Sequence, residues 1–207
     1  IEICHDKWNL WKFMELEGFN SPKTFLLAES DPPDTFPLIA KERSGEGGKN
    51  QSLIENQRDL DYCIDKYPNH IYQELIQGRE FSVDLFADVK GIPQLIVPRE
   101  RLSVRGGEVM TSKINMNESI IDLVEALSRR LTLTGPCNIQ GILDENDTFF
   151  FTDLNLRFGS GSVHTIAAGG DIPLMIYQEM AGQNFLEPSI QDHSVMTRYP
   201  ENIFHHS

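Results

Sequence analysis

The chain has 207 residues, 40% hydrophobic and 24% charged, a composition typical of a globular protein that can bury a substantial core in one large or two small domains. Its net charge of −13 argues against sequence-independent binding to nucleic acid, because phosphate backbones repel so acidic a chain at long range. No apolar run approaches the roughly 20 residues that a membrane-spanning helix needs.

The first part of the chain alternates short extended segments with two helices. Helical spacing of apolar residues, together with clusters of Pro, Gly and Asn, gives the expected boundaries. The expected elements, in order, are a helix over 6–17, a strand over 24–28, a loop over 29–35, a strand over 36–41, a glycine-containing loop over 44–50, an extended segment over 51–54, a helix over 56–66 and a strand over 71–76.

From residue 80 onward, polar and apolar residues alternate with the period of two that is typical of a half-buried strand. The expected elements are strands over 80–89, 92–97 and 108–114, a helix over 118–131, strands over 136–144 and 148–155, and two short helices before Gly182. Long antiparallel strands with interspersed helices indicate the α+β fold class.

A hairpin around Asn146 and Asp147 brings oxygen-bearing side chains together. If these two residues form the loop, pairing outward from it sets Gln140 opposite Asp153, and Asn138 opposite Asn155. Period two then puts all four side chains on one face of the hairpin. Such a cluster of carboxylate and amide oxygens suits Mg²⁺. A solvated polar sheet face is the alternative interpretation.

The loop over 44–50 contains Gly45, Gly47 and Gly48, and glycines let backbone N–H groups wrap an anion. Lys41 and Lys49 would supply positive charge. The spacing matches neither the phosphate-binding GxxxxGK[ST] pattern nor the GxGxxG of dinucleotide folds. A flexible hairpin tip is the alternative.

The segment from Glu74 to Ile76 is expected to join two parts of the fold, where its extended backbone could meet an adenine edge. The carboxylate of Glu80 could then hold ribose hydroxyls, although alternation on a strand would equally turn it to solvent.

Three arginines, Arg99, Arg101 and Arg105, stand at even spacing on strand-like sequence and are expected to share a face. In so acidic a chain this predicts oxyanion binding, with a charge-protected sheet edge as the alternative. Arg157 follows the proposed metal strand into a loop rich in Gly and Ser. His164 lies near that loop, where a structural role is the favoured interpretation.

The three cysteines, Cys4, Cys63 and Cys137, are odd in number and far apart in the sequence. This spacing excludes a CxxC zinc site, argues against a disulfide framework and indicates a reducing compartment. We therefore expect a cytoplasmic protein.

Taken in order, several short motifs resemble the ATP-grasp family, and most closely the ATP-grasp domain of the carbamoyl-phosphate synthase large chain. The resemblance spans roughly residues 6–182. The matching elements are Asp6-Lys7, Pro22-x-Thr24, Pro37-Leu-Ile-Ala-Lys41, Gly45-Glu-Gly-Gly48, Gln73-Glu-Leu-Ile-Gln-Gly-Arg-Glu80, Cys137-Asn-Ile-Gln140, Asp153-Leu-Asn-Leu-Arg157 and Ala168-Gly-Gly-Asp-Ile-Pro173.

The resemblance implies an ATP-grasp fold in which two α+β lobes with antiparallel sheets sandwich a nucleotide. Its parts would be an N-terminal helix and strand over 1–30, a small lobe over 31–78 and a large lobe over 79–207. The implied cofactors are ATP and Mg²⁺, with Mn²⁺ as a substitute.

Residue roles follow from the same resemblance. The implied roles are nucleotide phosphate binding for Lys7 and Lys41, loop closure for Glu46, Gly47 and Gly48, the adenine pocket for Glu74 and Ile76, ribose binding for Glu80, metal binding for Gln140, Asp153 and Asn155, and catalysis by Lys41 and Arg157.

The chain departs from the family pattern at three positions. Asp153 stands where the family usually has Glu, and Leu156 stands where it has Pro. Ser160 replaces a further Arg of the synthase type, which puts carbamate phosphorylation in doubt. The family's usual N-terminal α/β domain is absent, and the sequence starts at Ile1 without an initiator Met. We therefore expect a missing N-terminal domain or a partner subunit, and a homodimer remains compatible with the sequence.

The implied activity is that of an ADP-forming carboxylate–amine ligase, similar to carbamoyl-phosphate synthase. ATP would convert a small-molecule carboxylate into an acyl phosphate, and an amine or similar nucleophile would displace phosphate. Two other interpretations stay open: a non-catalytic Mg-ATP-binding module that acts as a sensor or partner subunit, and a purely structural interaction domain.

Overall fold

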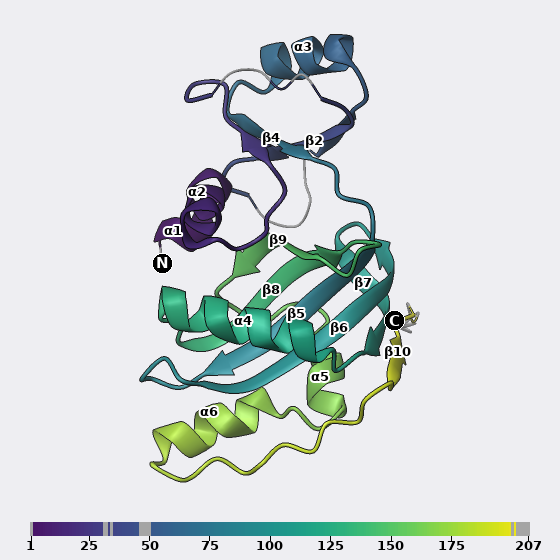
Figure 1. Ribbon diagram of the computed structural model, residues 1–207. Coiled ribbons are helices and arrows are strands. Elements are labelled where there is room, and N and C mark those ends of the chain that lie inside the picture. Colours follow the sequence, from purple (N-terminus) through teal and green to yellow (C-terminus); the bar gives the residue numbers. More distant parts are fainter. Residues whose placement is uncertain (1, 31–32, 34, 46–50, 200, 202–207) are drawn as a thin grey trace, which may run out of the picture.

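Two antiparallel sheets with helices packed on them make up the fold, the smaller sheet above the larger one in Figure 1. The computed structural model describes residues 2–30, 33, 35–45, 51–199 and 201. The α+β class predicted from the sequence is confirmed. Most of the predicted glycine-containing loop, residues 46–50, lies outside the described residues.

The small sheet has the strand order β1-β4-β2-β3, and the helix α3 (Gln57–Lys66) packs on it. Its strands are β1 (Thr24–Phe25), β2 (Leu38–Glu42), β3 (Ser52–Ile54) and β4 (His70–Glu74). Asn56 caps α3 as predicted, since its side chain accepts a hydrogen bond from the Asp59 backbone N–H at 3.1 Å. Leu60 and Cys63 of α3 pack against Tyr72 of β4. The strand predicted over 24–28 is shorter than expected and ends at Phe25.

The large sheet has the strand order β10-β7-β6-β5-β8-β9. Its strands are β5 (Arg79–Ala87), β6 (Pro93–Arg105), β7 (Glu108–Ile114), β8 (Gly135–Leu143), β9 (Phe149–Asn155) and β10 (Val195–Thr197). The sequence did not predict β10, which adds a short edge strand to β7. Gly106 and Gly107, both at positive φ, make the predicted reversal between β6 and β7.

One face of the large sheet is covered by the helix α4 (Glu118–Leu131), together with α1 (Glu2–His5) and α2 (Lys7–Glu17). Ile120, Val124 and Leu127 of α4 are completely buried, as the predicted amphipathic helix requires. The apolar residues of the predicted alternation in β5, such as Phe81 and Val83, point into the same core.

The opposite face of the large sheet is divided into an apolar end and a polar end. At the apolar end, α5 (Ser162–Ala167) and α6 (Ile172–Met180) pack on β5, β6 and β7, with Phe86, Val97 and Ile114 in the core. At the polar end the face stays uncovered by helices and forms the floor of a cleft. The side chains at this end are the candidates for function.

The helix α2 contacts both sheets, so it joins the two halves of the molecule. Leu10 and Met14 belong to the core of the large sheet. Trp8 packs with Leu26 and Ile71 against the small sheet. Figure 1 shows α2 lying beside the junction of the two sheets.

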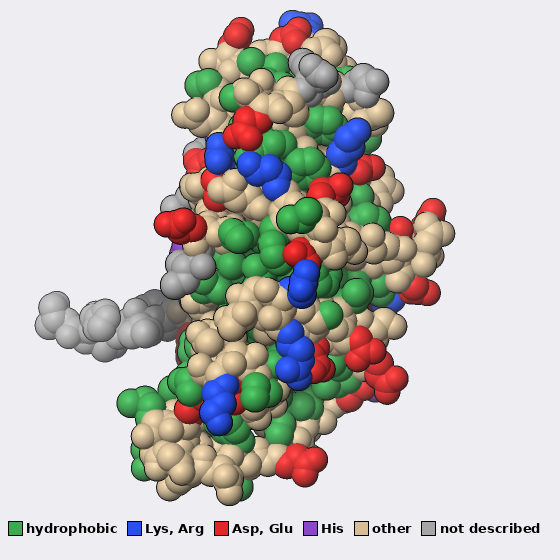
Figure 2. Space-filling model, turned by 60° about the vertical axis from the view of Figure 1, so that its left-hand side comes forward, with side chains coloured by type: hydrophobic (Ala, Val, Ile, Leu, Met, Phe, Trp, Pro, Cys, Tyr) green, Lys and Arg blue, Asp and Glu red, His purple; other side chains and the backbone are tan. Residues whose placement is uncertain are grey.

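Acidic and basic side chains are intermixed across the face of the molecule that Figure 2 turns forward. The net charge of −13 is therefore not gathered into one acidic patch on this face. Within the described part of the chain, every helix falls short of the length and hydropathy that a bilayer span requires.

Candidate functional site

A cleft of about 650 Å³ opens between the two sheets. The small sheet contributes residues of β2 and β4, and the large sheet contributes the polar end of its face. Its charged and polar lining residues include Lys41, Gln73, Glu74, Glu80, Ser82, Arg99, Arg101, Asn138, Gln140, Thr152, Asp153, Asn155, Arg157 and Ser160. Most of the residues that the sequence singled out therefore meet in one place.

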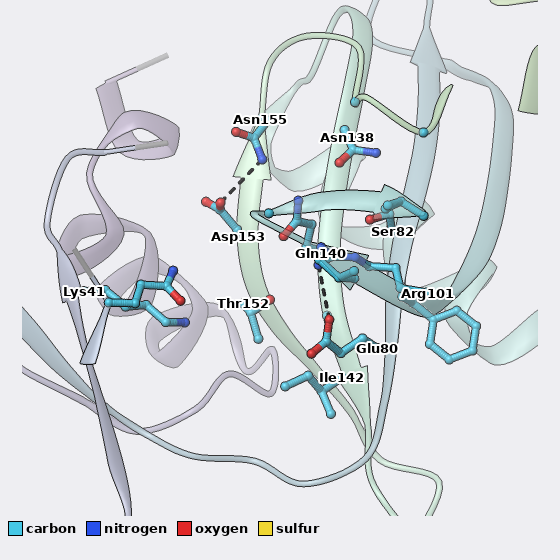
Figure 3. Close-up of a pocket in the computed structure, with 18 of the residues that line it drawn as sticks. Lys41, Glu80, Ser82, Arg101, Asn138, Gln140, Ile142, Thr152, Asp153 and Asn155 are labelled. Carbon is cyan, nitrogen blue, oxygen red and sulfur yellow. Dashed lines mark hydrogen bonds and ion pairs between the residues drawn. The ribbon is translucent and has the colours of Figure 1, made fainter. Parts of the chain in front are cut away.

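The floor of the cleft is built by cross-strand pairing. Residues that lie opposite one another on β9, β8, β5 and β6 form rows across the sheet. From β9 inward, the rows are Asp153, Gln140, Ser82 and Arg99; then Asn155, Asn138 and Asp84. Figure 3 shows Asp153 and Asn155 on one strand, with Gln140 and Asn138 on the next.

The predicted pairings Gln140 with Asp153 and Asn138 with Asn155 are confirmed, but the assumed loop is wrong. Asp144 N–H donates to the Thr148 carbonyl at 3.0 Å, so the turn contains Glu145 as well as Asn146 and Asp147. The longer turn shifts the pairing by one residue.

A β-bulge compensates for the longer turn. Gly141 pairs with Phe151 and Gln140 pairs with Asp153, so Thr152 is the extra, unpaired residue. The bulge lets Phe151 and Leu154 both reach the core while Asp153 and Asn155 face the cleft. A β-carbon on Gly141 would overlap the Phe149 ring, so this position next to the bulge requires glycine.

Gln140, Asp153 and Asn155 offer one carboxylate and two amide oxygens on neighbouring strands. Asn155 Nδ2 lies 3.5 Å from Asp153 Oδ2, and one Asp153 oxygen also accepts the Leu154 backbone N–H at 3.0 Å. Oxygen donors with a single carboxylate fit Mg²⁺, which binds few protein ligands and completes its shell with phosphates and water. Across the described residues, no group of three or more His, Cys, Asp or Glu forms a stronger metal site.

Lys41 reaches into the cleft from the opposite wall, on β2 (Figure 3). Its ammonium donates to Gln73 Oε1 at 2.7 Å, and Gln73 in turn donates to Thr24 Oγ1 at 3.0 Å. Burial lowers the pKa of Lys41 from 10.5 to about 8, while Asp153 and Glu80 pull it upward and Lys7 pulls it down. Gln73 belongs to one of the quoted motifs, but its role in orienting this ammonium was not predicted.

The segment between the sheets lines the cleft, and two of its backbone N–H groups are bonded within the protein. Glu74 N–H donates to the Lys23 carbonyl at 2.9 Å, and Leu75 N–H donates to the Pro37 carbonyl at 3.3 Å. Glu74, Leu75 and Ile76 all line the cleft. Glu80 lies nearby with its side chain 52% exposed, and one of its oxygens is 3.3 Å from Arg101 Nη1.

Lys7 lies at the edge of the glycine-containing loop, and it is not one of the residues that line the cleft. Its ammonium donates to the Gly45 carbonyl at 2.6 Å, and its backbone N–H donates to the Arg43 carbonyl at 3.0 Å. The predicted loop residues Glu46, Gly47 and Gly48 lie outside the described residues.

Arg157 lines the cleft just after β9, in the position the sequence predicted. Its side chain is exposed, and Nη1 donates to the Phe158 carbonyl at 3.0 Å. The nearby Ser160 carbonyl accepts a hydrogen bond from Arg198 Nη2 at 2.7 Å. A second guanidinium therefore lies close to the position where the synthase type has its further Arg.

Beneath the cleft lies a buried polar network centred on Asp84, which the sequence did not predict. Asp84 and Arg99 are each 1% exposed, and Arg99 Nε donates to Asp84 Oδ2 at 2.8 Å. The same carboxylate accepts from Asn138 at 2.8 Å and, from α5, Ser162 at 2.7 Å and Thr165 at 2.5 Å. Alternation placed Asp84 on the polar face, but only the packing of α5 shows that this part of the face is buried.

Arg99 and Arg101 share the cleft face, as their even spacing predicts. Arg105 is exposed and is not among the lining residues, because register irregularities between Arg101 and Val104 interrupt the alternation. His164 has the expected structural role. It is buried, with Nδ1 2.8 Å from Ser112 Oγ and Nε2 3.2 Å from Ser194 Oγ.

A model of the ATP-grasp domain matches residues 4–161. A carbamoyl-phosphate synthase from Methanobrevibacter smithii is 23% identical over 150 residues, which cover 70% of this chain and 36% of that protein. The chain thus spans little more than a third of this relative's length.

Two solved structures have a similar fold. Biotin carboxylase from Campylobacter jejuni, in a β,γ-ATP complex, matches 95% of this chain and 51% of its own with a TM-score of 0.77 at 17% identity. The biotin carboxylase domain of 2-oxoglutarate carboxylase from Hydrogenobacter thermophilus, in complex with MgADP, ADP and bicarbonate, matches 95% of this chain and 50% of its own. Its TM-score is 0.76 at 15% identity.

Proposed function

The chain belongs to the ATP-grasp family, and from this premise we propose that it acts in an ADP-forming carboxylate–amine ligase. ATP phosphorylates a carboxylate to an acyl phosphate, and an amine or similar nucleophile then displaces phosphate. The observation that carries the proposal is the convergence of Lys41, Asp153 and Arg157 on one cleft between two sheets. No side-chain nucleophile is needed, because positioning and charge neutralisation account for such a reaction.

In this proposal Gln140, Asp153 and Asn155 hold Mg²⁺, or Mn²⁺ in its place. The support is the chemistry of the three side chains, which supply oxygen ligands from adjacent strands. The bound ion would neutralise charge on the nucleotide phosphates during transfer.

The chain's own residues position the nucleotide. Lys41 faces the phosphates from the small sheet, and its hydrogen bond to Gln73 orients the ammonium group. The backbone of Glu74 and Ile76 meets the adenine, and Glu80 binds the ribose hydroxyls. Arg157 stabilises charge on the transferred phosphoryl group.

Lys7 has a less direct role in the proposal than the resemblance implies. Its ammonium holds the Gly45 carbonyl at the start of the loop that contains Glu46, Gly47 and Gly48. It would reach the phosphates by exchanging this carbonyl for a phosphate oxygen when the loop closes.

The amine acceptor is proposed to bind beside Arg157 and Ser160, which both line the cleft. Relatives of the carbamoyl-phosphate synthase type are longer than this chain, so a further domain or partner subunit completes the acceptor site in this proposal. The neighbour crystallised with MgADP, ADP and bicarbonate supports a small carboxylate-like substrate in addition to the nucleotide.

Phosphate release from Mg-ATP, measured with a panel of carboxylates and amines, tests the proposal. We expect release to depend on a carboxylate. Asp153→Asn should lower it on the order of 100-fold, because the metal ligand set loses its only carboxylate. The matched control is Asp147→Asn, which changes an 87% exposed carboxylate in the turn of the same hairpin. Unchanged turnover in Asp153→Asn would refute the assignment.

A non-catalytic Mg-ATP-binding module is the second candidate, favoured by the single carboxylate at the metal site. Calorimetry with Mg-ATP separates the two candidates. Binding without carboxylate-dependent phosphate release would establish the second candidate. Absence of nucleotide binding would exclude both and leave a structural interaction domain.

A further inference from the structure

Two arginines in the floor of the cleft carry hydrogen-bond donors that no group in the described part of the chain accepts. Arg99 is 1% exposed and its Nη1 is buried without a partner. Arg101 is 12% exposed and its Nε is likewise buried without a partner. A buried guanidinium N–H left unpaired is costly, and such groups in a folded protein often mark a ligand site.

Nearby carboxylates do not satisfy these donors. Asp84 takes Arg99 Nε, but its two oxygens are also occupied by Asn138, Ser162 and Thr165. Nothing remains of that carboxylate for Arg99 Nη1. Arg99 is therefore held in place through Nε, while its Nη1 remains a donor without an acceptor among the described residues.

Among the described residues, the carboxylate paired with Arg101 is that of Glu80, which is far more exposed than the arginine. Glu80 lies 3.3 Å from Arg101 Nη1, but its side chain is 52% exposed whereas that of Arg101 is 12% exposed. Figure 3 shows Glu80 projecting into the cleft between Ile142 and Arg101. Burial lowers the pKa of Arg101, with Arg99 adding to the effect, so the guanidinium is poorly compensated even with Glu80 in place.

The two arginines lie apart from the proposed metal ligands. In the row that begins with Asp153, Ser82 separates Gln140 from Arg99. Two strand spacings place Arg99 roughly 10 Å along the sheet from Gln140. One small anionic group cannot contact both Gln140 and Arg99, whereas a molecule with two anionic groups can place one toward each side chain.

We propose that Arg99 and Arg101 form a second anion subsite, which binds an additional anionic group of the carboxylate substrate. The substrate class is then a dicarboxylate or a similar dianion, whose reacting carboxylate lies toward Gln140 and Asp153. This inference rests on the proposed function, which identifies the carboxylate near Gln140 and Asp153 as the one that reacts. Gly161 runs directly against Arg99, and a β-carbon there would overlap Nη1, so the loop adds no side chain over the guanidinium.

The same geometry couples the subsite to the nucleotide. When Glu80 turns to the ribose, Arg101 loses its counter-ion and attracts an anion more strongly. Nucleotide and dianion therefore bind cooperatively, with the nucleotide preparing the subsite.

Calorimetric titration of the full chain with succinate tests this inference, with acetate as the monoanion, each alone and with saturating Mg-ADP. We expect succinate to bind at least tenfold more tightly than acetate, because only succinate can place one carboxylate at the arginines and the other toward Gln140. Mg-ADP should tighten succinate binding by about threefold or more. Equal binding of acetate and succinate, or competition between succinate and Mg-ADP, would overturn the subsite.

Arg101→Gln and Arg105→Gln form a matched pair, because both arginines lie on β6 and only Arg101 lines the cleft. Arg101→Gln should weaken succinate binding about tenfold and leave acetate binding unchanged. Arg105→Gln should bind succinate and acetate with the same affinities as the unaltered chain. Circular dichroism and thermal melting establish that both variants fold, and full succinate affinity in folded Arg101→Gln would also overturn the subsite.

The experiment separates this inference from the proposed function. If Mg-ADP does not bind, the ligase proposal fails, but Arg101-dependent binding of succinate to the chain alone still supports the subsite. If Mg-ADP binds and succinate does not, the subsite fails and the ligase proposal stands.

Discussion

Lys41 illustrates how single residues acquire their properties from contacts far away in the sequence. Lys41 belongs to β2, but its hydrogen-bond acceptor Gln73 comes from β4. The carboxylates that raise its pKa, those of Asp153 and Glu80, come from the large sheet. Burial dominates, so the pKa of this ammonium falls to about 8 in the free protein. A phosphate bound beside Lys41 would raise that pKa again.

We therefore predict that the affinity for Mg-ADP depends on pH. A group whose pKa rises on binding contributes fully below its free pKa and loses that contribution above it. Affinity should be constant below pH 8 and then fall by up to tenfold per pH unit as free Lys41 loses its proton. Calorimetry between pH 7 and about pH 9.5 measures this dependence, covering the range from below the free pKa to well above it.

Lys41→Arg is the matched control for this experiment. Arginine stays protonated throughout the range, so the variant should bind with an affinity that is independent of pH, even if it binds more weakly. The same slope in both proteins would assign the titration to another group.

At the scale of elements, the hairpin of β8 and β9 determines which side chains reach the cleft. Its turn is one residue longer than the sequence suggested, and the bulge at Thr152 absorbs that residue. Because the two departures cancel, Asp153 still lies opposite Gln140. Phe151, 3% exposed, keeps its place in the core for the same reason.

Two single-residue deletions test this account of the hairpin. Deleting Thr152 removes the bulge but leaves Phe151 opposite Gly141 and Asp153 opposite Gln140, so the free energy of unfolding should change by about 1 kcal/mol or less. Deleting Phe150 also removes the bulge, but it turns Phe151 out of the core and should cost about 3 kcal/mol. Urea unfolding compares them, and equal losses would contradict the assigned register.

At the scale of the whole molecule, α2 ties the two sheets together. Met14, 1% exposed, packs into the core of the large sheet, while Trp8 packs with Ile71 on the small sheet. The edge of the large sheet is also linked to the chain after α2, since Phe151 N–H donates to the Asn20 carbonyl at 2.9 Å. One helix with a buried contact on each side should make the two sheets unfold together.

The chain's two tryptophans, Trp8 and Trp11, both lie in α2 and report on this junction. We predict that urea transitions followed by tryptophan fluorescence and by far-ultraviolet circular dichroism coincide. Met14→Ala should cost about 3 kcal/mol and shift both transitions equally.

Leu16→Ala, on the same helix but at an 82% exposed position, should leave the transitions nearly unchanged. Separate fluorescence and dichroism midpoints would show that the sheets unfold independently.

The sequence by itself determined the type of most elements, because helical and strand periodicity are local properties of the chain. The alternation of Phe81 and Val83 with Glu80 and Ser82 fixed which residues share a face. The antiparallel pairing of Gln140 with Asp153 could be found for the same reason, since a hairpin joins neighbouring segments.

Only the tertiary structure decided the rest, since burial and partners depend on segments that are distant in sequence. Alternation placed Asp84 on the polar face, but α5 covers that part of the face and turns the residue into a buried acceptor for Arg99. The resemblance implied the same phosphate-binding role for Lys7 and Lys41, yet Lys7 holds the Gly45 carbonyl and Lys41 enters the cleft. Contacts such as these join residues that are distant in the sequence, so local sequence patterns cannot predict them.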